Sequence, residues 1–228
     1  MKLLRLIPLA ILLGSCVTIY NKNYLMDINE ATINNSKFKL NGYYYHVNEI
    51  ESYPYYKNQY GGYSQDSTKS YTKILIKPLM LYGDGSAYLP DHFSGMQDNL
   101  VFDFANCGLV NNNNIIGAQT HFECYVLNRP EKQYNFMNRK GEIWNQGLFK
   151  VDGNTIKLQI FYNVWGNYYL YEKTGHILAD GSIKFIHAKD YQNNVEFDLE
   201  EIYYFKEFMI EPKVESYIMK NKHEFNKN

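Results

Sequence analysis

An Asp-Gly dipeptide recurs three times in this 228-residue chain, each time between runs of apolar residues. It lies within the segments Tyr82–Ser86, Val151–Asn154 and Ala179–Ser182. Asp-Gly suits the positive φ angles of tight hairpin turns, and the twist of such turns matches that of the flanking strands. The sequence therefore predicts three β-hairpins, and with them a largely antiparallel β architecture.

The runs beside these turns have the spacing of strands. Apolar and polar residues alternate through 156–160, 183–185 and 195–199. A period of two, with charge on the opposite face, is typical of strands that bury one side and expose the other. The double acid Glu200-Glu201 breaks the alternation, which predicts a β-bulge or a bend.

Two earlier stretches, 38–47 and 72–82, are rich in Tyr, Ile and Leu and also predict strands. The residues between them, 51–70, are polar and include Pro54 and the pair Gly61-Gly62, so a long loop is expected.

Residues from about 91 to 139 carry helical signals instead. Ser94-Gly95-Met96-Gln97 fits a capping box, and Pro130 stands at a favoured first helical position. A further helix is predicted from about Gly117 to Leu127, after a loop at 111–114. The chain therefore has a helical insertion between its early and late strands.

A meander of short connections has to hide its edge strands, by closing into a barrel or by covering them. The predicted fold is mainly β: an antiparallel meander that forms a lipocalin-like barrel, or a curved half-barrel with the helical insertion across one opening. Gly42-Tyr43-Tyr44 is similar to the Gly-x-Trp start of lipocalins, with tyrosine in place of tryptophan.

The N-terminus has the three parts of a secretion signal: the basic residues Lys2 and Arg5, the apolar run Leu6–Leu13, and small residues after it. The apolar run is much shorter than the roughly 20 residues of a membrane-spanning helix. Residues 1–15 are therefore expected to be a cleaved signal peptide.

Leu13-Gly14-Ser15-Cys16 resembles the lipobox of bacterial lipoproteins. In that family, diacylglycerol is attached to the cysteine thiol and the signal peptide is cut before it. The resemblance implies that Cys16 carries the lipid and anchors the protein to the membrane. Val17 stands where an aspartate would favour the inner membrane, which implies the outer membrane. No acidic cluster of the kind that some lipoproteins use for surface display lies next to Cys16, which implies a position facing the periplasm. The alternative is an ordinary signal peptide followed by an incidental cysteine.

Composition divides the rest of the chain into three parts. Residues 16–36 are polar without a sustained period and are expected to form a tether. Residues 37–210 have the length of a single β domain. Residues 211–228 are rich in Lys, Asn and Glu and are expected to form a polar C-terminal tail, as a short helix or a frayed end.

Two cysteines remain after Cys16, namely Cys107 and Cys124. The cell envelope permits disulfides, so the two could be bridged. The alternative is a pair of buried thiols that pack as small apolar groups.

Tyrosine is unusually frequent, with 23 residues in clusters along the predicted strands. Tyrosines at the mouth of a barrel could stack on a ligand and offer it hydroxyl groups. The candidates for this role are Tyr43, Tyr45, Tyr168 and Tyr171. The alternative is that tyrosine fills half-buried strand positions because it favours strands.

No motif in the chain identifies a reaction. His121-Phe122-Glu123-Cys124 lacks the second half of a zinc-deaminase signature. His176 and His187 flank a predicted turn, but two histidines without a third ligand make a weak metal site. Asp91-His92 could be half of a catalytic pair, but no serine lies in a Gly-x-Ser-x-Gly elbow and no cysteine has an evident activating partner. We therefore expect no metal and no cofactor.

The formal net charge of −1, with Lys and Glu scattered along the chain, argues against a nucleic-acid partner. Two functional hypotheses remain. The first is a non-enzymatic envelope lipoprotein whose β domain binds a partner protein or a small ligand. The second is a periplasmic hydrolase whose site is assembled only by the fold. A polar pocket with a carboxylate pair or a Ser/His contact would favour the hydrolase, and a pocket of tyrosines and aliphatics would favour binding.

Overall fold

The computed structural model describes residues 18–27, 33–57, 59–60, 63–96, 112–128, 143–209 and 216–225. Its strands are β1 Ile33–Asn34, β2 Gly42–Ser52, β3 Tyr55–Lys57, β4 Tyr63–Gln65, β5 Tyr71–Leu81, β6 Ser86–Tyr88, β7 Phe93–Ser94, β8 Gln146–Asp152, β9 Thr155–Val164, β10 Asn167–Ile177, β11 Ile183–Asp190 and β12 Val195–Glu207. Its helices are η1 Lys22–Tyr24, α1 Ile115–Asn128, α3 Tyr217–Lys220 and α4 Lys222–Phe225.

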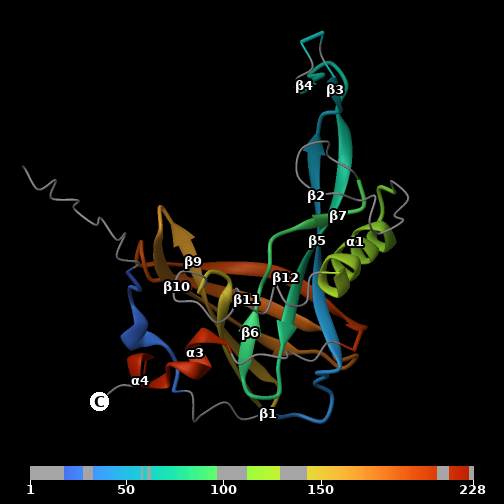
Figure 1. Cartoon of the computed structure of the whole chain (residues 1–228). Helices are drawn as coiled ribbons and strands as arrows, with labels where there is room; N and C mark the ends of the chain where they lie inside the picture. The colour runs from blue at the N-terminus through green and yellow to red at the C-terminus, as the bar shows by residue number, and fades with distance from the viewer. Residues whose placement is uncertain are drawn as a thin grey trace, which may run out of the picture.

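Eight antiparallel strands close into a barrel in the order β8-β6-β5-β2-β12-β11-β10-β9, and β9 pairs again with β8 (Figure 1). Closure removes the free edges that an open meander would leave. The predicted mainly β barrel with a small helical insertion is confirmed, in its closed form. The short strand β1 adds in parallel to the end of β8.

Two of the predicted turns share one geometry. Gly85 and Gly181 have φ of 87° and 86°. In the second turn the Gly181 amide donates to Leu178 O at 3.0 Å, and the Asp180 carboxylate accepts from the Ser182 amide at 2.9 Å. Each loop thus has three residues with a single glycine at positive φ, whereas the Asp-Gly pairs suggested two-residue turns. The aspartate here is a local hydrogen-bond acceptor.

The third predicted turn has positive φ at Gly153 (55°) and not at Asn154. A turn with positive φ at both central residues joins β9 to β10 instead, at Trp165 (53°) and Gly166 (82°). Trp165 is 96% exposed at its tip. The dipeptide Trp-Gly did not predict a turn there, because only its glycine readily adopts a positive φ and this turn needs a positive φ at both residues.

Beyond the barrel, β2 and β5 continue as a two-stranded arm (Figure 1). β12 pairs only with residues 42–45 of β2, whereas the β2–β5 ladder runs on to the pair Ser52–Tyr71. The short strands β3 and β4 pair with each other at the end of the arm. The loop expected at 51–70 is therefore partly strand.

The barrel interior is filled at one end by apolar side chains, among them Tyr44, Leu79, Phe149, Phe185 and Tyr203, none more than 1% exposed. Burying each such side chain stabilises the fold by about 1.5–3 kcal/mol. Two further clusters lie on the outer surface of the barrel. One joins β2 and β5 to α1, and the other joins β8, β9 and β10 to the C-terminal helices.

The segment expected to be a tether packs on the barrel wherever it is described. The Tyr20 amide donates to Tyr168 O at 2.8 Å, Leu25 is 2% exposed, and the Met26 amide donates to Gln159 at 2.6 Å. A few apolar residues without regular spacing, such as Ile19 and Leu25, are enough to hold this segment against the outer strands.

The C-terminal region is likewise more ordered than a polar tail. α3 and α4 bury Tyr217, Ile218, Met219 and Phe225. The predicted short helix is present, and its apolar face covers the outside of the barrel.

The helical insertion is confirmed in part. α1 matches the helix predicted at Gly117–Leu127, and the Gly117 amide donates to the Asn114 side chain at 2.7 Å, as at a capped helix start. Ser94 lies in β7, so its predicted role in a helix cap is wrong; its hydroxyl accepts from the Met96 amide at 3.0 Å. The helix predicted from Pro130 lies outside the described residues. None of the helices described is long and apolar enough to cross a membrane.

Candidate functional site

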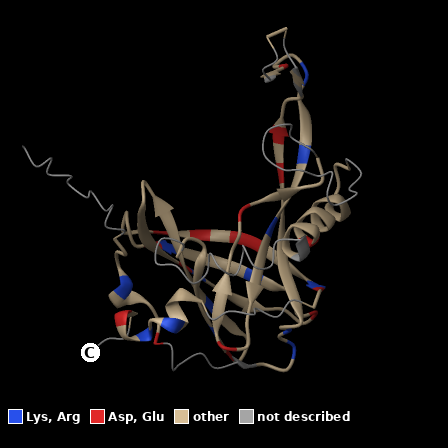
Figure 2. Ribbon diagram, in the orientation of Figure 1, with Lys and Arg blue, Asp and Glu red and all other residues tan. Residues whose placement is uncertain are grey.

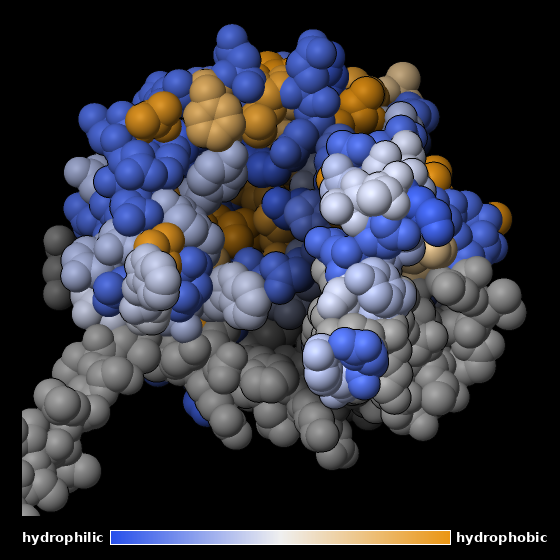
Figure 3. Space-filling view, turned by 90° about the horizontal axis from the view of Figure 1, so that it is seen from above, coloured by the Kyte–Doolittle hydropathy of each residue, from blue (hydrophilic) through white to orange (hydrophobic). Residues whose placement is uncertain are grey.

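The open end of the barrel contains a cavity of about 340 Å³. Seen from above, the molecule has a hollow here with hydrophobic residues in its depth and mostly hydrophilic residues around its rim (Figure 3). The described residues that line it are Lys77, Leu89, Pro90, Asp91, His92, Asn145, Ile160, Tyr162, Tyr171, Lys173 and Glu201. Its volume is at the lower end of the roughly 300–1,000 Å³ that is usual for ligand pockets.

The cavity lies where two neighbouring strands separate. β2 and β12 are paired up to Tyr45 and Tyr204, and beyond this point β2 continues into the arm. The His46 ring, through Nδ1, contacts Ile202 O at 2.9 Å and bridges the start of the gap. The divergence opens the barrel at this end, while the other end stays filled by the apolar core.

An ion pair between Lys173 of β10 and Glu201 of β12 forms one wall. The side chains are 3% and 25% exposed. The Lys173 ammonium also lies 5.6 Å from the ring centres of Phe185 and Tyr203, which favours the cation electrostatically. A buried ion pair costs desolvation that its attraction only partly repays, so the pair is not explained by stability alone.

The pKa values follow from this environment. Burial lowers the pKa of Lys173 to about 8, although the Glu201 carboxylate acts in the opposite direction. Burial alone would raise the pKa of Glu201, but Lys173 and Lys77 outweigh it and hold that pKa below its usual value. Near neutral pH both groups are charged.

Two more basic side chains face the same space. Within the described part of the chain, Lys77 makes no ion pair or hydrogen bond. Burial, followed by the charge of Lys77, lowers the pKa of His92, so its imidazole is neutral near pH 7. The cavity wall therefore has two ammonium groups against the single interior carboxylate of Glu201; the second carboxylate, that of Asp91, is exposed at the rim.

Tyrosines complete the wall. The Tyr162 hydroxyl donates to Asp190 at 2.7 Å, which fixes its ring at the rim. Tyr203 lies beneath the ion pair with its hydroxyl close to Glu201, yet this hydroxyl makes no hydrogen bond of standard geometry with a described residue. Burial, and then the charge of Glu201, raises the pKa of Tyr203 well above its usual value.

The lining residues limit the chemistry that this cavity could perform. None of the described lining residues is a serine, threonine or cysteine that could act as a nucleophile. Glu201 is held ionised by Lys173, so it is a poor proton donor. Among the described residues, no group of three or more His, Cys, Asp or Glu side chains is placed to hold a metal ion.

Of the four candidate tyrosines, Tyr171 lines the cavity. Tyr43 and Tyr45 lie on the outer face with the α1 cluster, where the Tyr43 hydroxyl donates to Glu123 at 2.8 Å. Tyr168 is buried on the outer face near the C-terminal helices. Side chains alternate along a strand, so Tyr168 and Tyr171, three positions apart, could not both point inward.

Asp91 and His92 both line the cavity, although sequence reasoning considered them only as half of a catalytic pair. His176 and His187 do not face each other: His176 is opposite Lys184 in the β10–β11 ladder, and His187 is opposite Thr174.

Cys124, in α1, is disulfide-bonded. The other two cysteines, Cys16 and Cys107, lie outside the described residues, so the Cys107–Cys124 bridge and the lipidation of Cys16 stay predictions.

Sequence reasoning missed the charged residues at the centre of the site. Lys173 and Tyr171 are two positions apart on β10, so a barrel that places one inside also places the other inside. Glu201 comes directly after the break in alternation at Glu200, and the β11–β12 ladder has a register shift between Phe185 and His187. A charged residue at a strand position whose neighbours two residues away point inward was the signal that could have predicted these site residues.

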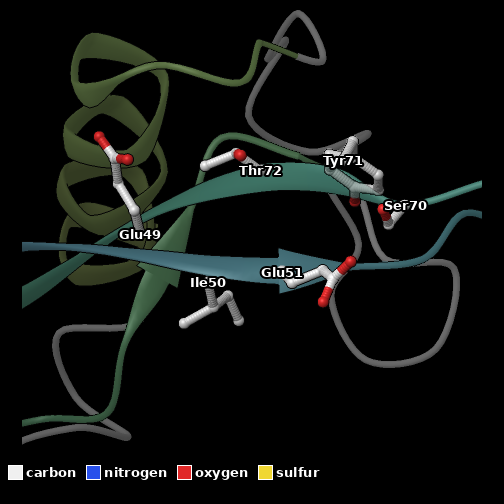
Figure 4. A pocket seen from close by; sticks show the side chains of 6 residues that line it. All are labelled: Glu49, Ile50, Glu51, Ser70, Tyr71 and Thr72. Atoms are coloured by element: carbon white, nitrogen blue, oxygen red, sulfur yellow. The ribbon is translucent and has the colours of Figure 1, made fainter.

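A second hollow, of about 520 Å³, lies on the arm and is lined by Glu49, Ile50, Glu51, Ser70, Tyr71 and Thr72. Its side chains point to different sides of the two-stranded ribbon (Figure 4). They do not converge on one point, so we do not regard this hollow as a site. Acidic residues are more prominent along the arm and β12 than elsewhere (Figure 2).

Comparison with known protein families, curated proteins and solved structures gives no match to this chain.

Proposed function

We propose that this chain is a non-enzymatic bacterial envelope lipoprotein, anchored through Cys16 and facing the periplasm from the outer membrane, that binds a small ligand in the mouth of its barrel. The observation that carries the binding role is the cavity at the open end of a closed barrel, with the buried pair Lys173–Glu201 in its wall. Buried charges in a ligand-sized cavity are characteristic of sites that recognise a polar group.

The anchoring part of the proposal rests on the lipobox-like sequence Leu13–Cys16. Replacement of the thiol in Cys16→Ser should abolish labelling by radioactive palmitate and leave an uncleaved or slowly processed precursor. Cys124→Ser, which removes a disulfide-bonded cysteine far along the chain, is the control and should be labelled normally. Undiminished labelling of Cys16→Ser would contradict the proposed anchor.

The binding part can be tested with a neutral fluorescent probe such as N-phenyl-1-naphthylamine. Leu89 lines the cavity and is 7% exposed, so Leu89→Trp should fill the space and abolish the rise in probe fluorescence. Thr72→Trp, on the exposed arm, is the matched control and should leave it unchanged. Equal fluorescence with both variants, at equal melting temperature, would show that the probe binds elsewhere.

A further inference from the structure

Given ligand binding as proposed above, we infer that the cavity selects a small amphipathic monoanion, an organic carboxylate whose charged group lies near Lys77 and whose apolar body contacts Leu89 and Ile160. The inference deepens the proposed function, and it rests on the charge balance and on the polarity of the cavity wall.

The charge balance favours a single negative charge. Lys173 forms an ion pair with Glu201, whereas Lys77 acts on Glu201 only through its charge and forms no ion pair with a described residue. The other lining carboxylate, that of Asp91, is exposed at the rim. An unpaired ammonium beside a partly buried space is stabilised by an anion. In the interior of the cavity, away from the exposed Asp91, one unmatched positive charge is balanced by a monoanion, while a phosphate monoester would bring close to two negative charges.

Hydrogen-bonding capacity points the same way. Lys77 offers ammonium donors, and the neutral His92 ring offers an N–H donor if its tautomer places the proton toward the cavity. An ionised carboxylate has only acceptors, so it can use these donors in charge-assisted bonds. An ammonium ligand would face Lys77 and Lys173 and would find Glu201 already occupied.

The remaining wall is apolar or aromatic. Leu89 and Ile160 are 7% and 4% exposed, and the rings of Tyr162 and Tyr171 stand beside them. Hydrophobic residues are visible in the depth of the hollow (Figure 3). A ligand with a charged end and an apolar body would therefore satisfy both parts of the site, within about 340 Å³.

The test uses four eight-carbon probes that differ only in their head group: octanoate, 1-octanol, octyl phosphate and octylammonium. Isothermal titration calorimetry at pH 7 on the full mature chain gives the dissociation constants. We expect octanoate to bind at least about tenfold more tightly than octanol, the usual difference for one charge-assisted hydrogen bond. Octyl phosphate should bind more weakly than octanoate, and octylammonium most weakly.

Lys77→Met should weaken octanoate binding by about tenfold or more and leave octanol binding unchanged. Lys77→Gln is a second variant that keeps the side chain polar. Lys184→Met removes a lysine outside the cavity whose ammonium lies 4.0 Å from the exposed Glu200 carboxylate, and it should bind like the wild type.

The outcomes separate the two claims. Octanol binding as tightly as octanoate, octyl phosphate or octylammonium binding more tightly, or unchanged octanoate binding in both Lys77 variants, would overturn the monoanion inference and leave ligand binding intact. Failure of all four probes to bind would overturn the proposed ligand binding itself.

Discussion

The ion pair between Lys173 and Glu201 is the main charged feature of the cavity wall. Removing one partner of a buried ion pair leaves an uncompensated charge, so Lys173→Met should lower the free energy of unfolding by about 3–5 kcal/mol. Adding Glu201→Leu removes that charge, and the double variant should recover most of the loss. Urea unfolding of the two single variants and the double variant measures this.

The exposed pair Lys189–Glu196, with N and O atoms 2.6 Å apart, is the control. A surface ion pair contributes about 0–1 kcal/mol, so Lys189→Met should change the unfolding free energy little. Similar losses for Lys189→Met and Lys173→Met would mean that burial does not set the cost at Lys173.

At this scale the sequence predicted little of the site. Of the four candidate tyrosines, Tyr171 lines the cavity, whereas Tyr43, Tyr45 and Tyr168 lie on the outer face. Tyrosine is found at inward and at outward strand positions, because α1 and the C-terminal helices bury parts of the outer face as well. Alternate side chains of a strand point to opposite faces, and only the closed barrel decides which of the two sets faces the cavity.

Elements were more predictable, since turns and alternation are local properties. Gly153 has φ of 55° with nothing within 4 Å of an added Cβ, whereas at Gly181, with φ of 86°, an added Cβ would lie 2.9 Å from Lys37 O. Gly153→Val should therefore cost only backbone strain, about 1–3 kcal/mol, and Gly181→Val should cost more because of the clash. Thermal and urea unfolding give both values.

Gly83→Val is the matched control, because Gly83 has no positive φ and the nearest atom to an added Cβ is 4.0 Å away. It should be close to neutral. Melting within about a degree of the wild type for all three variants would show that the turn conformations do not require glycine.

The elements that sequence patterns missed have non-local causes. The arm exists because β2 pairs with β5 over a longer stretch than it pairs with β12. No local residue pattern predicts this difference between the two ladders. α3 and α4 have four residues each, too short for a helical period to be recognised. Their burial depends on the outer barrel surface that receives them.

For the whole molecule, tyrosine ionisation predicts a loss of stability in alkali. Burial raises the pKa of Tyr44 and Tyr171 to about 12 and raises those of Tyr43 and Tyr203 as well. In the unfolded chain tyrosines lose their protons near pH 10. Above that pH the folded state binds more protons than the unfolded state, so the unfolding free energy falls as pH rises.

Urea unfolding between about pH 9 and 11 should show this fall, and tyrosinate absorbance should appear together with unfolding. Lys173 acts in the opposite direction at lower pH. Its folded pKa of about 8 lies below its unfolded value, so it contributes a rise in stability between about pH 8 and 10. A flat profile above pH 10 would mean that the buried tyrosines ionise without unfolding.

The N-terminal segment places the proposed anchor, Cys16, close to the β9–β10 turn. The Tyr168 amide donates to Thr18 O at 2.9 Å, and Cys16 precedes Thr18 by two residues, a reach of at most about 7 Å. Trp165, at the exposed tip of the β9–β10 turn, precedes Tyr168 by three residues. A lipid on Cys16 would therefore hold this turn near the membrane surface, where tryptophan is favoured.

We expect brominated phospholipids to quench the fluorescence of Trp165 in the lipidated protein on vesicles. Trp144→Phe leaves Trp165 as the sole tryptophan and isolates its signal. As a control, Ala179→Trp in a Trp144→Phe/Trp165→Phe background places the reporter in the β10–β11 loop. β10 spans Asn167–Ile177, so this reporter is roughly 30 Å from the β9–β10 turn and should stay unquenched. Equal quenching at both positions would mean that the barrel has no fixed orientation, and quenching of the Cys16→Ser protein would show that the turn binds the membrane without the lipid.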